Sequence, residues 1–153
     1  MTVHFAYGSN MSRPLMQQRC PSAQAIGTAA IRGWRFSIIP NGFASIVPAP
    51  GEVVHGVLWR LGPRDLAAIN AYESLDSGLY VRRTLPVRHR GQTVPALVYV
   101  SQRRGEGRPR AGYMAVVEQA ARDWRLPERY VDALRRWAPA SRQGRWKDTG
   151  ELG

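Results

Sequence analysis

The chain has 153 residues, of which 44% are apolar and 22% are charged, and its formal net charge is +11. This length predicts one domain, and the apolar fraction excludes a disordered chain. No apolar run approaches the roughly 18 residues that a membrane-spanning helix needs, so we expect no interaction with a membrane.

The N-terminal residues Met1 to Phe5 contain no basic segment, long apolar stretch or small-residue cleavage site, so we expect no signal peptide. Cys20 is the only cysteine, which excludes an internal disulfide and any structural zinc site that needs two thiolates from one chain. These features favour a reducing, cytoplasmic location.

The positive charge comes almost entirely from arginine, because Lys147 is the one lysine among the 22 basic residues. These residues are scattered along the chain, and such a charge attracts polyanions through its field alone. The sequence contains no zinc-finger spacing, RNP-like aromatic motif or basic zipper, and so it predicts no specific nucleic-acid partner.

The first half of the chain is predicted to be rich in strands. Val3–Tyr7 indicates a strand, and Ser12 is expected to cap a short helix that carries Leu15 and Met16, with Pro14 in its first turn. Gly33 and Pro40-Asn41-Gly42 are expected to separate three short strands, which are Ala25–Ile31, Arg35–Ile39 and Ala44–Val47.

A stronger strand is predicted over Val53–Leu61, and Pro63 is expected to open a helix. The apolar residues of that helix, Leu66, Ile69 and Tyr72, lie close to helical spacing. Two further strands, joined by a tight turn at Arg90-Gly91, are predicted over Tyr80–His89 and Gln92–Val100.

The last part of the predicted domain is helical. Apolar residues recur at helical spacing from Tyr113 to Trp124, and Pro127 begins a second helix whose Tyr130, Leu134 and Trp137 face inward. The elements predict one α+β domain over residues 1–138, with a mostly antiparallel or mixed sheet. Residues 139–153 are polar and rich in glycine, which predicts a loose tail.

Common catalytic and cofactor motifs are absent from the sequence. There is no glycine-rich phosphate loop and no dinucleotide-binding motif. His4, His55 and His89 lie in three separate predicted strands without metal-ligand spacing, so we interpret each as structural and expect no metal.

The segment Tyr7-Gly8-Ser9-Asn10-Met11 is the first candidate site, because it joins a predicted strand to a predicted helix. Backbone N–H groups at such a turn are unpaired within the helix and can bind a carboxylate or an oxyanion. The alternative is a simple turn in which Ser9 or Asn10 caps the helix.

Glu73 is the second candidate, because it lies seven residues after Leu66 and so falls on the apolar face of its predicted helix. Desolvation there would raise the pKa of its carboxyl group toward neutral pH, which suits a general acid and base. The alternative is that the helix ends at about Tyr72 and that Glu73 faces solvent. Asp76 is a weaker candidate, since it adjoins the turn-forming pair Ser77-Gly78.

Several segments occur in a fixed order at compatible spacings, namely Phe5–Met11, Gly33–Phe36, Val54–Leu61, Tyr72-Glu73 with Gly78–Tyr80, Tyr99, and Tyr113 with Leu126-Pro127. In this arrangement the chain, from Phe5 to about Tyr130, resembles the γ-glutamylcyclotransferases, also described as AIG2-like proteins. The resemblance implies a small mixed β-barrel with flanking helices. It also implies a reaction without a cofactor, in which a small γ-glutamyl compound cyclises to 5-oxoproline and releases an amine or amino acid.

The resemblance further assigns roles to residues of this chain. Glu73 would be the general acid and base, and the substrate would be bound by Tyr7, Gly8, Ser9, Asn10, Met11, Tyr80, Tyr99 and Tyr113. Ser74 departs from the family pattern, which has glycine after the glutamate, and this affects the local turn and the identity of the substrate.

Two alternatives stay open beside this interpretation. One is a variant enzyme that acts on γ-glutamylamines, and the other is a noncatalytic small-molecule binding module of the same fold. The sequence predicts no particular leaving group or oligomeric state.

Overall fold

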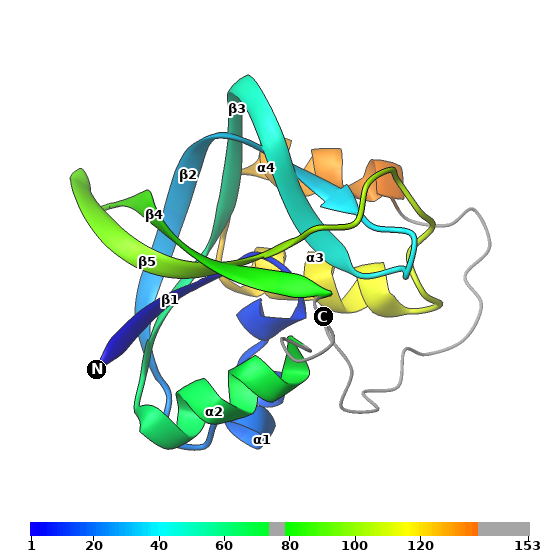
Figure 1. The fold of residues 1–153 in the computed structure, drawn as a ribbon. Coiled ribbons are helices and arrows are strands. Elements are labelled where there is room, and N and C mark those ends of the chain that lie inside the picture. Colours follow the sequence, from blue (N-terminus) through cyan, green and yellow to red (C-terminus); the bar gives the residue numbers. More distant parts are fainter. Residues whose placement is uncertain (74–78, 138–153) are drawn as a thin grey trace.

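A computed structural model of the chain describes residues 1–73 and 79–137. Its strands form a closed barrel in the spatial order β1-β3-β2-β4-β5, and helices flank the barrel (Figure 1). The strands are β1 (Thr2–Ala6), β2 (Gln24–Ile38), β3 (Ala44–Leu61), β4 (Tyr80–His89) and β5 (Gln92–Ser101). The helices are η1 (Ser9–Met11), α1 (Arg13–Arg19), α2 (Pro63–Tyr72), α3 (Tyr113–Asp123), α4 (Glu128–Leu134) and η3 (Arg135–Trp137).

The barrel closes through one parallel contact. β1 runs antiparallel to β3 and parallel to β5, where His4 pairs with Leu97, and the other neighbouring strands are antiparallel. The predicted α+β class and the small mixed barrel with flanking helices are therefore confirmed. Strand pairing alone brings residues near the N-terminus beside residues of β5.

Two local predictions are confirmed by their geometry. The Ser12 side chain accepts a hydrogen bond from the backbone N–H of Leu15 at 3.4 Å, as expected of a helix cap. Arg90 and Gly91 both have positive φ, 50° and 78°, which is the backbone that a two-residue hairpin turn of type I′ requires.

The prediction of short separate strands between residues 25 and 61 is wrong. Gly33 does not end a strand, because its φ of +84° forms a bulge between Arg32 and Trp34 and pairing continues on both sides. β2 and β3 are thus long strands paired over most of their length, and the predicted break at Pro40–Gly42 is the turn between them. A bulge and a strand end have the same sequence pattern, and only the partner strand distinguishes them.

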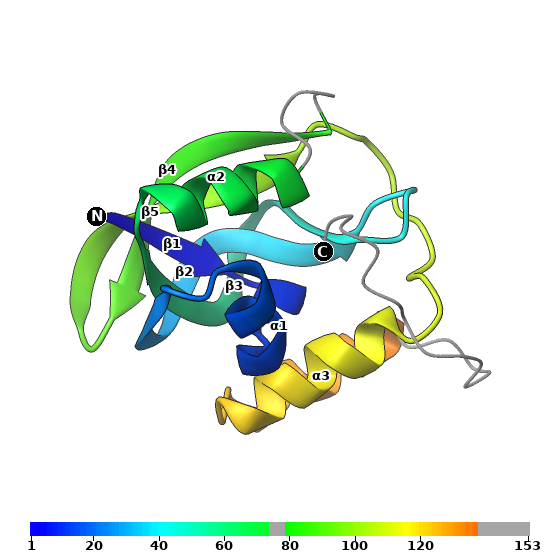
Figure 2. The same ribbon diagram turned by 90° about the horizontal axis from the view of Figure 1, so that it is seen from below.

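Beside the barrel, the short helices pack against one another. η1 packs against both α1 and α3, α1 packs against α2, and in the view from below α1 lies between α2 and α3 (Figure 2). The C-terminus of α2 is thereby brought toward the loop that follows β1. No helix of the described residues is long and apolar enough to cross a membrane.

Four features of the sequence analysis lie outside the described residues. They are Ser74, Asp76, the Ser77-Gly78 turn and the tail over 139–153. The domain limit at residue 138 and the tail stay predictions.

Candidate active site

A narrow cavity lies where β1 ends, between the loop after β1, the end of α2 and the strand β5. It is lined by His4, Phe5, Ala6, Tyr7, Gly8, Asn10, Ala44, Glu73 and Tyr99. About 10 Å³ is open to the centre of a water molecule, which is room for about one water. A larger ligand must therefore displace side chains of this lining.

Five of the nine residues predicted for the site, distant in sequence, meet in this cavity. They are Tyr7, Gly8, Asn10, Glu73 and Tyr99, from three separate segments. The other four, Ser9, Met11, Tyr80 and Tyr113, are buried beside the cavity and are not among its lining residues.

Glu73 is the buried carboxyl group of the site. Helix α2 ends at Tyr72, as the alternative interpretation held, yet the Glu73 side chain does not reach solvent, since the residue is only 6% exposed. The backbone N–H of Glu73 donates to the Ile69 carbonyl at 2.8 Å, which fixes its position at the end of the helix. Burial raises the pKa of Glu73 to about 8, against the opposing effect of the positive charge of Arg19.

The loop after β1 is held as one turn of 3-10 helix. The backbone N–H of Met11 donates to the Gly8 carbonyl at 3.1 Å, and the N–H of Ser12 donates to the Ser9 carbonyl at 2.9 Å. The Met11 carbonyl in turn accepts from the indole N–H of Trp124 at 2.7 Å, which anchors the loop to the end of α3. Within this loop, Gly8 and Asn10 face the cavity.

The predicted tyrosines divide into two pairs with different positions. Tyr80 donates from its hydroxyl to the Ala44 carbonyl at 2.5 Å, and the Ala44 N–H donates to the Tyr113 hydroxyl at 3.3 Å. These two side chains therefore hold the backbone of Ala44, which is a wall of the cavity. Tyr7 and Tyr99 line the cavity itself, and the Tyr99 hydroxyl donates to Oδ1 of Asn70 at 2.5 Å.

His4 is a lining residue that the sequence analysis interpreted as structural. Its Nδ1 lies 3.1 Å from the Leu97 carbonyl, which can only accept, so Nδ1 carries the proton and Nε2 presents a lone pair. Nε2 is buried without a hydrogen-bond partner among the described residues. Burial lowers the pKa of His4 to about 4, so the ring is neutral at pH 7.

Arg19 is the second residue that the sequence analysis missed. It is 4% exposed, and its Nη1 donates to Oγ of Ser9 at 3.0 Å and to Oδ1 of Asn10 at 2.5 Å. Helical spacing could have identified it, because Arg19 lies three residues after the buried Met16 and so falls on the same helix face. The same kind of spacing places Glu73 on the apolar face of its own helix.

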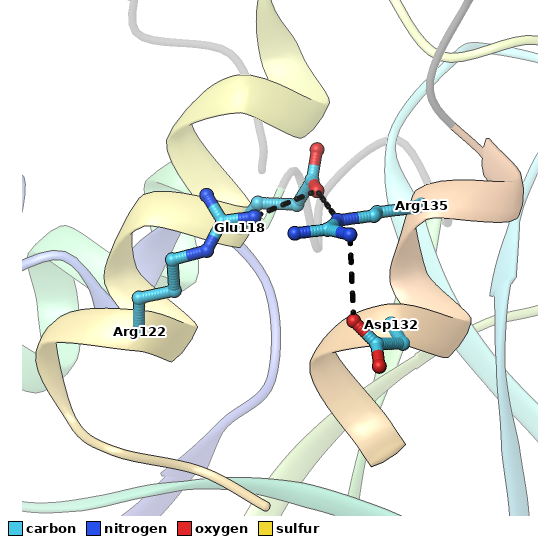
Figure 3. Close-up of polar contacts among 4 residues, drawn as sticks. All are labelled: Glu118, Arg122, Asp132 and Arg135. Carbon is cyan, nitrogen blue, oxygen red and sulfur yellow. Dashed lines mark ion pairs between the residues drawn. The ribbon is translucent and has the colours of Figure 1, made fainter. Parts of the chain in front are cut away.

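A larger hollow, of about 610 Å³, lies between α3 and α4, away from this cavity. Charged side chains of α3, α4 and η3 beside it pair with one another, as Figure 3 shows. Glu118 lies 3.8 Å from Arg122 and 3.7 Å from Arg135, and Arg135 lies 3.5 Å from Asp132. Catalytic groups have their pKa values tuned by burial, so the small cavity with its buried titratable groups is the better candidate site.

The described residues favour neither metal binding nor chemistry at a cysteine. Among residues 1–73 and 79–137, no group of three His, Cys, Asp or Glu side chains could hold a metal ion. Burial raises the pKa of the Cys20 thiol to about 12, which disfavours the nucleophilic thiolate.

Comparison with known proteins gives consistent matches. The family model described as gamma-glutamyl cyclotransferase, AIG2-like, matches residues 4–126. Gamma-glutamylcyclotransferase of Mus musculus is 26% identical over 97% of this chain and 85% of its own length, and that of Homo sapiens is 25% identical over 94% and 82%. A solved structure described as gamma-glutamyl cyclotransferase has a TM-score of 0.88 at 23% identity and covers 97% of this chain and 95% of that one, so it has the same fold.

Proposed function

Because the chain belongs to the gamma-glutamyl cyclotransferase, AIG2-like family of enzymes, we propose that it converts a γ-glutamyl amino acid or γ-glutamyl amine to 5-oxoproline. The other product is the free amino acid or amine. One observation carries the assignment to this cavity: Glu73, a buried carboxyl group with a raised pKa, shares it with Gly8 and Asn10 of the predicted anion-binding loop.

The reaction balances within the substrate. The α-amine of the γ-glutamyl group attacks its own γ-carbonyl carbon, so that a new C–N bond closes a five-membered ring. The C–N bond to the leaving amine then breaks, and the protons that the attacking nitrogen loses pass to the departing one. Because nucleophile and electrophile belong to one molecule, orientation supplies much of the rate enhancement and no cofactor is required.

Glu73 suits the proton transfer because of its pKa. The α-ammonium group of a γ-glutamyl compound neighbours a free carboxylate, so its pKa lies somewhat above the ordinary value of about 8 for a peptide N-terminus, and the Glu73 carboxyl group has a pKa of about 8. The two values are close enough for proton transfer, so the Glu73 carboxylate takes a proton from the ammonium group to free the amine and gives a proton to the leaving nitrogen. The attacking nitrogen loses two protons in all, and the released amine carries both away as an ammonium ion.

The remaining predicted residues bind and shape the substrate. The backbone N–H groups of Gly8 and Asn10 would bind the substrate carboxylate or the oxyanion of the tetrahedral intermediate. Tyr99 would contact the substrate directly. Tyr80 and Tyr113 would act through Ala44, because both bond to its backbone.

The cellular location of the protein and the identity of the leaving group also belong to this proposal. We expect a small γ-glutamyl compound as substrate and a cytoplasmic setting, which the single cysteine favours. A γ-glutamyl dipeptide and a γ-glutamylamine, such as a conjugate of a lysine side chain, are the two substrate classes to compare.

The test is a 5-oxoproline release assay over a panel of γ-glutamyl dipeptides and γ-glutamylamines. We expect 5-oxoproline and free amine in equal amounts from at least one class. An α-glutamyl dipeptide is the matched control, since it lacks a γ-amide and has no leaving group for this cyclisation. No release from any compound, together with 5-oxoproline binding in calorimetry, would instead indicate a noncatalytic binding module.

A further inference from the structure

We propose that Arg19 is a positioning residue that ties the loop after β1 to the end of α2, and so sets the geometry between the loop and Glu73. This inference rests on the proposed function, since it concerns the same cavity. Arg19 is not among the residues that line the cavity, and its effect is exerted through the groups it contacts.

The guanidinium group contacts both sides of the site. On the loop side, Nη1 donates to the side chains of Ser9 and Asn10. On the helix side, its Cζ lies 4.5 Å from the ring centroid of Tyr72, the residue that precedes Glu73. The planar, forked guanidinium group can bond and stack at once, which the ammonium group of lysine cannot do.

The burial of Arg19 indicates that this position is specific. A charged side chain that is only 4% exposed carries a large desolvation cost unless it is bonded in good geometry. The bonds to Ser9 and Asn10 explain why these two polar side chains are also buried. Both side chains bond to Arg19, and Asn10 is at the same time a lining residue of the cavity, as is Gly8.

The charge of Arg19 has a second consequence for Glu73. Several other titratable groups face Glu73 from different elements, and burial keeps them neutral: Tyr7 after β1, Tyr80 of β4, Tyr99 of β5, Tyr113 of α3, and His4 of β1. The positive charge of Arg19 opposes the effect of burial, so that the pKa of Glu73 stays within reach of an α-ammonium group.

The experiment compares Arg19→Met and Arg19→Lys with Arg13→Met. Arg13 lies on the same helix, is exposed, and stacks on Trp124 at 3.9 Å, so it is a matched arginine away from the cavity. Two properties are measured: the steady-state parameters kcat and KM of the cyclisation reaction, and the titration of the Glu73 carboxyl carbon by ¹³C NMR. The NMR signal is assigned by its loss in Glu73→Gln.

The two Arg19 variants distinguish the effect of the guanidinium contacts from the effect of the positive charge. Arg19→Lys should raise KM about tenfold or more through loss of the forked contacts, while the Glu73 midpoint moves by less than about half a pH unit. Arg19→Met should raise KM similarly and also move the midpoint upward by about one pH unit. Arg13→Met should leave both properties unchanged.

The result that would overturn the proposal is a wild-type KM and an unchanged Glu73 titration in both Arg19 variants. If Arg19→Met does not fold, Arg19→Lys alone tests the proposal, and a wild-type KM in that variant overturns it. The proposed function fails separately: a wild type that releases no 5-oxoproline refutes the reaction, whereas the NMR titration and the affinity for 5-oxoproline still report the effect of Arg19.

Discussion

The hydroxyl group of Tyr7 donates a hydrogen bond to the backbone carbonyl of Tyr99, 2.5 Å away and 92 residues further along the chain. This bond joins the loop after β1 to β5 at the cavity. The parallel pairing of His4 with Leu97 brings the same two segments together. One wall of the candidate site therefore depends on how the barrel closes.

Tyr7→Phe should destabilise the protein, because it removes this buried bond without changing the ring. A lost buried hydrogen bond costs about 1–2 kcal/mol, which for a chain of this size lowers Tm by roughly 3–6 °C. Calorimetry at pH 7 measures the change. A Tm equal to that of the wild type would mean that the bond contributes nothing to stability.

Glu73→Gln should lower kcat by at least about 100-fold, since glutamine keeps the shape of the side chain but cannot transfer a proton. KM should change far less. In the wild type, kcat/KM should rise with pH as both Glu73, with its pKa of about 8, and the α-ammonium group of the substrate lose protons, and the residual activity of the variant should keep only the part of the rise that comes from the substrate. Initial rates of 5-oxoproline release from about pH 5 to about pH 10 test both statements.

The matched control for that variant is Glu52→Gln, at an exposed glutamate that faces Arg35. It should keep full activity. If Glu73→Gln does the same, the carboxyl group is structural and Asp76 becomes the candidate for proton transfer.

The same substitution should change stability with a definite sign. Burial raises the pKa of Glu73 in the folded state from 4.5 to about 8, so its contribution to stability is fully present below pH 4.5 and is lost as pH rises through 8. Glu73→Gln should thus equal the wild type near pH 4.5 and exceed it above pH 8, by about 5 kcal/mol. Urea denaturation at about pH 4.5, 7 and 9 measures this, and a variant less stable than the wild type at the highest pH would contradict it.

His4 should contribute a pH dependence in the opposite direction. Its folded-state pKa of about 4 lies below the ordinary 6.5, so its contribution to stability is present above pH 6.5 and is lost as pH falls toward 4. The loss approaches about 3 kcal/mol. His4→Asn keeps a donor for the Leu97 carbonyl but does not titrate, so the free energy of unfolding should fall less between pH 7 and pH 4 than in the wild type.

Gly8→Val should abolish binding of 5-oxoproline, because Gly8 lines the narrow cavity and a branched side chain would fill it. Gly8 is buried and follows the core residues Phe5, Ala6 and Tyr7, so the Tm of the variant is measured first to establish that it is folded. Calorimetric titration with 5-oxoproline measures the binding. Undiminished affinity in a folded Gly8→Val variant would place the ligand away from this loop.

Much of the secondary structure could be predicted from the sequence because it depends on local chemistry. The Ser12 cap and the Arg90-Gly91 turn follow from side-chain bonding and backbone freedom within a few residues. The lengths of β2 and β3 could not be predicted, since Gly33 has the local pattern of a strand end. Pairing with the partner strand carries the chain through it as a bulge.

For the candidate site, the sequence by itself supplied the candidate groups: a carboxyl group at Glu73 and a Gly-Ser-Asn loop after a strand. Only the tertiary structure decided that the two meet, that α2 ends at Tyr72 without exposing Glu73, and that Arg19 and His4 belong beside them. The physical reason is that burial and its effect on a pKa depend on segments far apart in the chain. The pattern around Glu73 fits a solvated carboxylate as well as a desolvated one, and closure of the barrel selects the desolvated one.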